Sequence, residues 1–196
     1  TGDCDVSRTG NVMVNWKIKW AVNAWLADAT AAEATYGHIS TWQTGEVTDM
    51  SELFEDASSF NEDIGAWDTS GVTSMVEMFQ DASSFNQDIG GWSVGAVIDM
   101  QKMFLWASSF NQDIGKWAVD NVTSLNEMFR FASAFDQDIG AWKIGKVTTM
   151  RSMFNRNEVF NQDIGTWDTS GVTEMSHVFD GASSFNQAIG NWDVSN

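Results

Sequence analysis

The sequence predicts an α/β solenoid, in which similar coils stack along one axis and each contributes a short strand and a short helix. Two observations predict this class: tryptophan recurs every 25 residues, and the same apolar positions stay constant from one 25-residue unit to the next. Self-similarity at a fixed period of this length is the signature of repeat architectures. The recurring tryptophans are Trp42, Trp67, Trp92, Trp117, Trp142, Trp167 and Trp192. Six units therefore run from residue 42 to residue 191, and a seventh begins at Trp192.

Six positions never change in units one to six, and they predict the core. They hold Trp, Val, two Phe, Ile and Gly, which in the second unit are Trp67, Val72, Phe79, Phe85, Ile89 and Gly90. Positions that accept only one size of apolar group are typical of a close-packed interior. The residue after each tryptophan, by contrast, varies from Gln43 to Asp68 to Lys143, so these side chains are expected to face water.

A short helix is predicted in each unit after the constant valine. The apolar residues of this segment have the spacing of one helix face, and in the second unit they are Val72, Met75, Met78, Phe79 and Ala82. Serine or aspartate followed three residues later by glutamate is the capping-box signature of a helix start. Such pairs are Asp49 with Glu52, Ser74 with Glu77, and Ser124 with Glu127. Each helix is therefore expected to begin at this point of the unit.

The rest of the unit is expected to form a polar turn and a short strand. The run Ser-Ser-Phe-Asn-Gln-Asp is turn material held by one buried phenylalanine, and the following Ile-Gly-x-Trp-x-Thr alternates loosely, as a strand does. Strands of successive units would pair in parallel about 4.8 Å apart, and the tryptophans would form a continuous file. Burial of one indole contributes at most about 4–6 kcal/mol, so folding energy alone explains the constant aromatic positions.

Residues 12–36 do not fit the 25-residue register, and residues 1–41 are predicted to form an N-terminal cap, whereas residues 42–196 form the solenoid. An amphipathic helix is expected in the cap around Trp16, Trp20, Trp25 and Leu26. Ile39 stands 25 residues before Ile64 and so begins the register. A solenoid needs a cap to cover the apolar face of its first coil. No comparable cap follows Trp192, so the last coil is expected to be continued by a longer parent chain or covered by another chain.

Two units share the motif F-N-x-D-I-G-x-W-D-T-S-G-V-T-x-M-x-x-x-F-x-x-A-S-S: residues 60–84 and residues 160–184. This motif resembles the BspA-like surface-protein repeat of bacterial and mycoplasma surface lipoproteins and of many protist and algal proteins. That repeat looks like a divergent leucine-rich repeat, whose inward positions match Ile64, Trp67, Thr69, Val72 and Met75. The resemblance implies a right-handed, leucine-rich-repeat-like stack. For function, it implies exposure on a cell surface and recognition or adhesion.

The motif departs from the leucine-rich pattern at Val72, which stands where asparagine is usual. Backbone amides at the bend then need another partner, and a column of asparagines is expected to supply it as a ladder. These are Asn61, Asn86, Asn111, Asn161 and Asn186. Asp136 occupies this column in the fourth unit, and we expect it to break the ladder because a carboxylate only accepts hydrogen bonds.

Composition narrows the class of protein and of partner. The 196 residues include 27 Asp and Glu against 10 Lys and Arg, a net charge of −17, with 11 Trp and 13 Phe. Disordered acidic segments contain few aromatics, so a folded domain is expected, and so acidic a surface argues against nucleic acid as a partner. No apolar run approaches the roughly 20 residues that span a membrane, so no membrane insertion is expected. The single cysteine, Cys4, either pairs with another chain or stays a free thiol.

Catalytic side chains are few. The chain has two histidines, His38 and His177, with one cysteine and one tyrosine, and none lies beside another in the repeat register. Nucleophilic catalysis of the Ser-His-Asp or Cys-His kind would need one of these histidines. A glycosidase needs two acids in different environments, whereas most acids here are duplicated by the repeat. The sequence therefore predicts a non-enzymatic protein without a cofactor.

One column of the repeat is acidic, and it consists of Asp63, Asp88, Asp113, Asp138 and Asp163. Stacked carboxylates repel one another, so each is expected to accept amide hydrogen bonds from its own turn and to stay partly solvated. The alternative is a file of calcium sites, because calcium binds carboxylate and carbonyl oxygens. Ala188 stands in this column in the sixth unit, so the column tolerates loss of the acid.

Asn121 begins the one N-glycosylation sequon, Asn-Val-Thr. Its column varies between units, so the side chain is expected to be exposed. Because glycosylation requires a eukaryotic secretory route, Asn121 is a conditional candidate for modification.

The repeat breaks its own pattern in units three to five. Seven of the 10 basic residues lie between positions 102 and 156, and units one and two have none. In the same window, the column that begins with Asp56 and Asp81 turns aromatic and then basic. Exposed aromatic and arginine side chains are typical of interface hot spots, unless the rings pack on a neighbouring loop or a partner domain. The candidate partner-binding residues are Leu105, Trp106, Arg130, Phe131, Arg151 and Arg156.

Together these features predict a non-enzymatic recognition or adhesion module, extracellular or at a cell surface, that binds a protein or a glycan. The alternative is a structural module whose units assemble end to end into a filament or matrix through the uncovered edge near Trp192, with or without calcium. An assembling module would show a size that depends on concentration, and a receptor would not.

Overall fold

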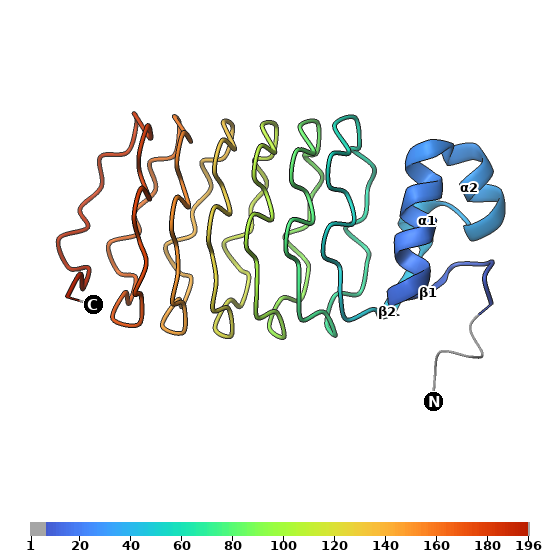
Figure 1. Cartoon of the computed structure of the whole chain (residues 1–196), viewed down its shortest axis with the longest axis horizontal. Helices are drawn as coiled ribbons and strands as arrows, with labels where there is room; N and C mark the ends of the chain where they lie inside the picture. The colour runs from blue at the N-terminus through green and yellow to red at the C-terminus, as the bar shows by residue number, and fades with distance from the viewer. Residues whose placement is uncertain (1–6, 196) are drawn as a thin grey trace.

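The computed structural model describes residues 7–195, and Figure 1 shows an elongated row of coils with a helical segment at the N-terminal end. All regular elements of the described chain precede residue 47. They are β1 Val12–Val14, α1 Asn15–Ala27, α2 Ala29–Tyr36, the 3₁₀ helix η1 Ile39–Thr41 and β2 Gln43–Glu46. From residue 47 to residue 195, the chain consists of turns, isolated bridges and irregular segments.

The helical segment packs against the first coil. In α1 the buried apolar residues recur at intervals of three and four, and they are Ile18, Ala21, Val22 and Trp25. The Asp28 carboxylate begins α2 by accepting a hydrogen bond from the Ala31 N–H at 3.1 Å. Trp25 meets Trp42, the first indole of the repeat, edge to face at 6.2 Å between ring centroids. β1 also pairs in parallel with β2, so both helical and extended elements join this segment to the repeat.

The helices predicted within the repeat do not form. In the second unit, the N–H groups of Glu77, Phe79 and Asp81 donate to carbonyl groups of the next coil at 2.8–2.9 Å, not to carbonyls four residues earlier. The alternate N–H groups, such as that of Gln80, close tight turns by donating to the carbonyl three residues earlier. The segment is therefore a series of turns that is hydrogen-bonded to its neighbour in the stack.

Left-handed backbone at two positions of each unit explains this error. Glu77 and Asp81 have φ values of +57° and +58°, and a right-handed helix cannot continue through such residues. Asp49, the first residue of one predicted capping box, closes a shorter loop instead: its carboxylate accepts a hydrogen bond from the Ser51 N–H at 2.9 Å. Successive tight turns also bury residues three and four apart, so the apolar spacing did not distinguish them from a helix.

Except for β2 in the first coil, the predicted strands are turns as well. The Trp67 N–H donates to the Ile64 carbonyl at 3.1 Å, which closes a tight turn across the segment expected to be extended. Parallel bridges between coils occur instead just before the first methionine of the unit, where Ser74 pairs with Asp49 on one side and Asp99 on the other. The ladder between coils therefore runs through the segment predicted as helix.

The constant side chains form files through the core. Five indoles are 3–4% exposed, and each Nε1 donates to an isoleucine carbonyl of the preceding coil at 2.9–3.2 Å: Trp67, Trp92, Trp117, Trp142 and Trp167. Phe79 stacks on Phe85 within its coil at 4.0 Å between centroids, and on Phe104 of the next coil at 5.6 Å. Aromatic contacts therefore hold each coil together and join it to its neighbours.

The constant glycine is required by the close approach of coils. A Cβ placed on Gly115 would lie 2.4 Å from the carbonyl oxygen of Asp138 in the next coil, and Gly90 and Gly140 are equally close to their neighbours. Gly91, the next residue along from Gly90, would meet nothing within 4 Å. The constant position thus has a steric cause that the variable one lacks.

The asparagine column forms the expected ladder, but Asp136 does not break it. Asn111 accepts from the Asp136 N–H at 3.0 Å through Oδ1. Asp136 in turn accepts from the Asn161 N–H and the Gln162 side-chain amide, both at 2.9 Å. The prediction of a break is wrong because the ladder uses the side-chain oxygen only as an acceptor, and a carboxylate supplies that as well as an amide.

The last described coil is less covered than the others. Phe185, Ile189 and Trp192 are partly buried, whereas Phe160 and Ile164, their counterparts one unit earlier, are fully buried. These side chains contact only one neighbouring coil within residues 7–195.

Candidate partner-binding surface

One column of the repeat, here called the edge column, has left-handed backbone in every unit. It contains Asp56, Asp81, Trp106, Phe131, Arg156 and Gly181, with φ between +57° and +76°. Each of the first five donates its N–H to a carbonyl of the next coil at 2.8–2.9 Å. Large side chains rarely adopt this conformation, so the inter-coil hydrogen bonds and not the residue type fix the backbone here.

Trp106 and Phe131 form a stacked pair in the edge column. Their ring centroids are 3.7 Å apart and their planes differ by 5°. The Trp106 side chain remains 45% exposed and Phe131 is half-buried. The rings therefore pack on each other, and both side chains are still partly open to solvent. Leu105, by contrast, is 7% exposed, so its place among the exposed residues of the predicted surface is wrong.

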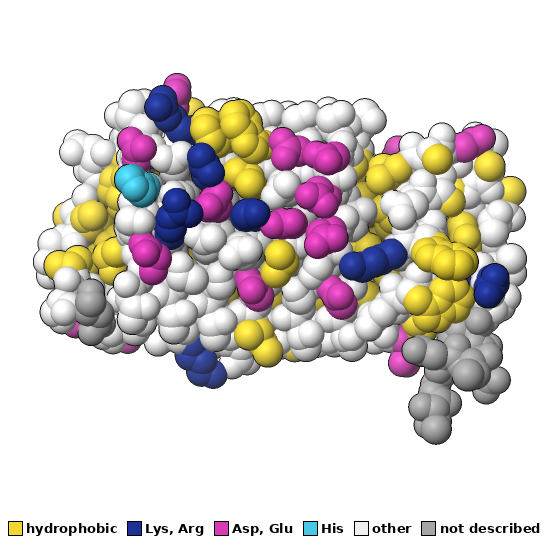
Figure 2. All heavy atoms as spheres, in the orientation of Figure 1, with side chains coloured by type: hydrophobic (Ala, Val, Ile, Leu, Met, Phe, Trp, Pro, Cys, Tyr) yellow, Lys and Arg dark blue, Asp and Glu magenta, His cyan; other side chains and the backbone are white. Residues whose placement is uncertain are grey.

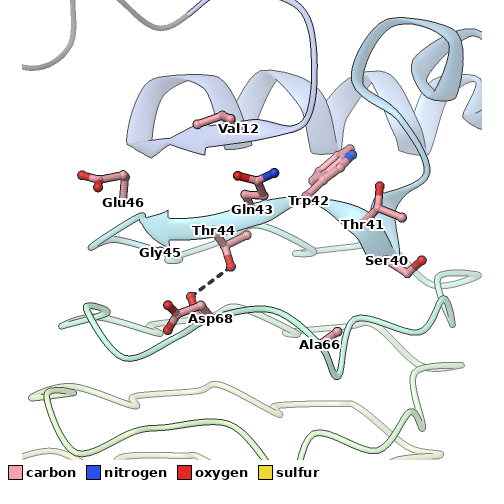
Figure 3. Close-up of a pocket in the computed structure, with 10 residues that line it drawn as sticks. All are labelled: Val12, Ser40, Thr41, Trp42, Gln43, Thr44, Gly45, Glu46, Ala66 and Asp68. Atoms are coloured by element: carbon pink, nitrogen blue, oxygen red, sulfur yellow. Dashed lines mark hydrogen bonds between the residues drawn. The ribbon is translucent and has the colours of Figure 1, made fainter.

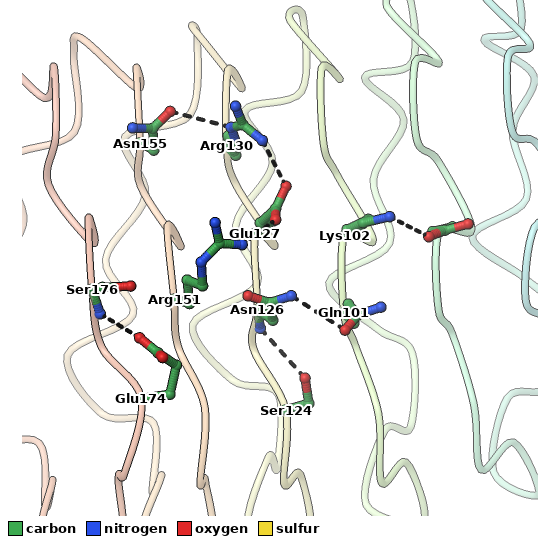
Figure 4. Close-up of polar contacts among 11 residues, drawn as sticks. Gln101, Lys102, Ser124, Asn126, Glu127, Arg130, Arg151, Asn155, Glu174 and Ser176 are labelled. Atoms are coloured by element: carbon green, nitrogen blue, oxygen red, sulfur yellow. Dashed lines mark hydrogen bonds and ion pairs between the residues drawn. The ribbon is translucent and has the colours of Figure 1, made fainter.

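Two arginines of the predicted set are anchored by one buried acid. Glu127 is 7% exposed and accepts from Arg130 Nη1 at 2.8 Å and from Arg151 Nη1 at 3.2 Å. Arg130 also donates through Nε to Asn155 Oδ1 at 3.2 Å, and its guanidinium carbon lies 5.2 Å from the Phe131 ring centroid. Figure 4 shows Glu127, Arg130, Arg151 and Asn155 close together on two successive coils. Glu127 thus holds both cations next to the aromatic pair.

Arg156 continues the edge column after Phe131. The side chain is exposed and its Cδ lies 2.6 Å from the place a Cβ would take on Gly181, so its stem lies over that glycine. Among the described residues, Arg156 makes no ion pair. The absence of a side chain at Gly181 gives this stem its space.

The other end of the edge column is acidic. Burial and the nearby Asp56 carboxylate raise the pKa of Asp81. Burial, followed by the charges of Glu77, Glu52 and Asp56, raises the pKa of Glu55 as well. Figure 2 shows this face: acidic side chains lie over the coils nearer the cap, a hydrophobic cluster follows, and Lys and Arg side chains lie nearer the C-terminus.

The candidate calcium ligands serve their own turns. Asp63, Asp88, Asp113, Asp138 and Asp163 each accept a hydrogen bond through Oδ1 from the glycine N–H two residues later, at 2.9–3.0 Å. Residues 7–195 contain no group of three or more His, Cys, Asp or Glu side chains arranged to hold a metal ion. The turn contacts account for one oxygen of each acid.

The sequon asparagine is exposed and hydrogen-bonded. Asn121 donates through Nδ2 to the Gly95 carbonyl at 2.7 Å and accepts from Lys146 Nζ at 2.6 Å. Attachment of a glycan at Nδ2 would therefore replace a contact between two coils.

A hollow of about 760 Å³ lies where the first coil meets the N-terminal segment (Figure 3). The residues that line it include Trp42, Gly45 and Asp68. A hollow of about 430 Å³ recurs at Trp142, Gly145 and Asp168, which occupy the same columns of a later unit. The hollows are therefore a consequence of the repeat geometry. The residues named in each are ordinary members of the repeat columns and do not mark a special site.

The two histidines have different surroundings. His38 Nδ1 is 2.8 Å from Ser40 Oγ, and its ring meets Trp25 edge to face at 5.1 Å. His177, in the sixth unit, is exposed and has a left-handed backbone conformation. Cys4 lies outside the described residues. Within the described part of the chain, no helix is long and apolar enough to span a bilayer.

Sequence reasoning identified the aromatic pair and its arginines but missed Glu127, the side chain that positions them. A signal for it was present, because Glu127 precedes Arg130 by three residues and Arg151 by 24, nearly one unit. Residues at such separations are neighbours within a turn or across adjacent coils. Opposite charges at these separations are therefore the sequence pattern that indicates such an anchoring acid.

Comparison with known proteins gives one family. No curated protein and no solved structure matches the chain. A family model described as Mycoplasma protein of unknown function, DUF285, matches residues 23–137 and 113–196. The two matches overlap within the repeat and together extend over all six units. The chain therefore belongs to the family described as Mycoplasma protein of unknown function, DUF285.

Proposed function

We propose that this protein is a non-enzymatic recognition or adhesion module, extracellular or at a cell surface, and that it binds a protein partner through Trp106, Phe131 and the surrounding arginines. The exposed Trp106–Phe131 stack is the observation that carries the proposal. Tryptophan and arginine dominate the energetics of protein interfaces, and here they break an otherwise regular surface. The likeness of the repeat to BspA-like surface proteins supports the location.

The geometry favours a protein over a glycan at this surface. Sugar rings stack on open aromatic faces, as do other flat ligands, but Trp106 covers one face of Phe131 at 3.7 Å and the Arg130 guanidinium lies 5.2 Å from the same ring centroid. Ring edges and fixed guanidinium groups suit the irregular, polar rim of a protein interface. Glycan binding remains an outcome that the experiment distinguishes.

The second candidate function is a structural module that assembles end to end. The half-buried Phe185, Ile189 and Trp192 of the last described coil support it. Assembly through this end would not involve the edge column. Its sign would be particles that grow in size with concentration even after the edge column is changed.

The test compares two double variants in a screen of a glycan array and of purified surface proteins. Trp106→Asp with Phe131→Asp restores the acid that the edge column holds at Asp81. The matched control, Ile98→Thr with Val159→Ser, replaces two other exposed apolar side chains by the usual residues of their own columns. We expect the first variant to fold and to lose the protein ligands that the control retains. Equal binding by both variants would refute the proposed surface.

A further inference from the structure

Along the edge column, the charges on the two sides of the Trp106–Phe131 pair have opposite signs. Asp81 stands one unit before Trp106, and Arg156 stands one unit after Phe131. Neither Asp81 nor Arg156 forms an ion pair within the described residues. An acid at one end, two stacked rings in the middle and a cation at the other end form a pattern that is complementary to its own reversed copy.

The repeat makes the spacing match when the column is reversed. Each edge-column residue from Asp56 to Arg156 donates its N–H, at 2.8–2.9 Å, to the carbonyl of the residue that precedes the next edge-column residue, so the column has a regular step. A two-fold axis through the midpoint of the ring pair would place Trp106 opposite Phe131 of a second copy. It would also place Asp81 opposite Arg156, and each contact would occur twice, as in any isologous interface.

The side-chain positions fit this arrangement. The Arg156 stem lies over Gly181, where the edge column has no side chain. Its guanidinium is thus free to face Asp81 and Asp56 of a reversed copy, where burial and then the neighbouring Asp56 charge raise the pKa of Asp81. A cation brought against them would relieve the repulsion between the two carboxylates. Arg130 and Arg151, held by Glu127, add to the basic end.

We infer that the protein partner of this surface is a second copy of the same chain, docked antiparallel with the edge columns face to face. This inference rests on the proposed function and names its partner: recognition would be homophilic. Four facing side chains per copy bury less than the roughly 800 Å² per partner of a standard interface, and a net charge of −17 on each copy opposes association. The dimer is therefore expected to be weak.

Sedimentation velocity from about 1 μM to about 1 mM chain tests the dimer, because this range covers weak to moderate affinity. The informative variants are Asp81→Arg and Arg156→Asp. Each places like charges at both symmetry-related contacts and is expected to raise the dimer Kd by roughly tenfold or more. Both substitutions use residues that the edge column already carries, so the fold should accept them, and an unchanged thermal midpoint checks this.

Mixing the two single variants gives the decisive measurement. Asp81→Arg and Arg156→Asp should each be monomeric alone but should dimerise with each other, because every contact then joins opposite charges. The double variant should also regain the wild-type Kd. Lys143→Asp, at an exposed ion pair outside the edge column, is the matched control and should leave the Kd unchanged.

The outcomes separate this inference from the proposed function. A wild-type chain that stays monomeric throughout, or a dimer that neither charge reversal affects, overturns the homophilic dimer. Loss of a different protein ligand in the Trp106→Asp, Phe131→Asp variant would still uphold the recognition surface. Assembly that grows beyond dimers and ignores all these variants would point to the uncovered end of the stack instead.

Discussion

The indole Nε1 of Trp117 donates a hydrogen bond to the carbonyl oxygen of Ile89, 28 residues earlier, at 3.2 Å. The indole is 3% exposed, so its N–H has no access to water once the coils have stacked. The tryptophan column therefore does two things in each unit. It fills the core, and it pairs its own buried N–H with a carbonyl of the preceding coil that also accepts from the Trp92 N–H at 3.0 Å.

Replacement of this indole separates the two contributions. Trp117→Phe keeps much of the apolar volume but removes one of the two hydrogen bonds that the Ile89 carbonyl accepts, since the Trp92 N–H still donates to it at 3.0 Å. We expect a loss of about 0.5–1.5 kcal/mol in the free energy of unfolding. Trp117→Ala should cost about 3–5 kcal/mol, because it also leaves a cavity. Urea denaturation measures both. Trp20→Phe, at an indole that is 57% exposed, is the control and should change stability by less than about 0.5 kcal/mol.

A pair of adjacent-column glycines tests the close approach of coils. Gly115→Ala should destabilise the fold by about 1–3 kcal/mol or more, because the new Cβ would lie 2.4 Å from the Asp138 carbonyl oxygen and must push two coils apart. Gly91→Ala meets nothing within 4 Å and should be neutral or slightly stabilising. Thermal and urea unfolding compare them. If the two variants lost the same stability, the steric explanation of the constant glycine would be wrong.

The ladder that includes Asp136 predicts a difference between two small substitutions. Asp136→Asn keeps an acceptor for the Asn161 N–H and the Gln162 amide, and stability at neutral pH should change by less than about 0.5 kcal/mol. Asp136→Ala removes the acceptor of the Asn161 N–H and leaves the Gln162 amide with only the Asp136 backbone carbonyl, and a loss of about 0.5–1.5 kcal/mol is expected. Equal unfolding midpoints for the two variants would contradict a role for this side chain in the ladder.

The period and the buried positions of the repeat were readable from the sequence, but the backbone was not. Constancy across units identified Val72, Phe79 and Ile89 as core positions, and all three are fully buried. The helix and the strand were wrong because local spacing carries no information about hydrogen bonds to the next coil. Those bonds stabilise left-handed φ at residues such as Glu77, against the local preference of the chain.

The candidate surface was predicted in part, for a similar reason. Trp106 and Phe131 were identified because they depart from the acid that is usual in the edge column. Their exposure follows from the position of this column at the edge of the coil. The same reasoning included Leu105, whose side chain is buried even though the same column holds the partly exposed Gln80 and Arg130. Column statistics show where a repeat changes, whereas the direction of a side chain depends on a backbone that the sequence did not reveal.

The acidic end of the edge column makes stability depend on pH in a specific direction. Burial, then the charges of Glu77, Glu52 and Asp56, raises the pKa of Glu55 above its ordinary value. Between the ordinary and the raised pKa, the folded state binds more protons than the unfolded state, so the free energy of unfolding falls as pH rises through this window. Above the window, the full cost of the charged carboxylate remains.

Removal of that charge should therefore stabilise the fold at neutral pH. Glu55→Gln is expected to unfold at a higher temperature than the wild type at pH 7, and the difference should vanish as pH falls below about 4.3, the ordinary glutamate value. Asp68→Asn is the control of opposite sign. Hydrogen bonds from Ser70 lower the pKa of Asp68, so its contribution is present above the ordinary value and is lost as pH falls through the lowered one. Melting curves from pH 3 to pH 8 should thus show Asp68→Asn less stable than the wild type at neutral pH. A Glu55→Gln variant that is less stable than the wild type at pH 7 would show that the carboxylate contributes more through its contact with the Gln80 amide than it costs through its charge.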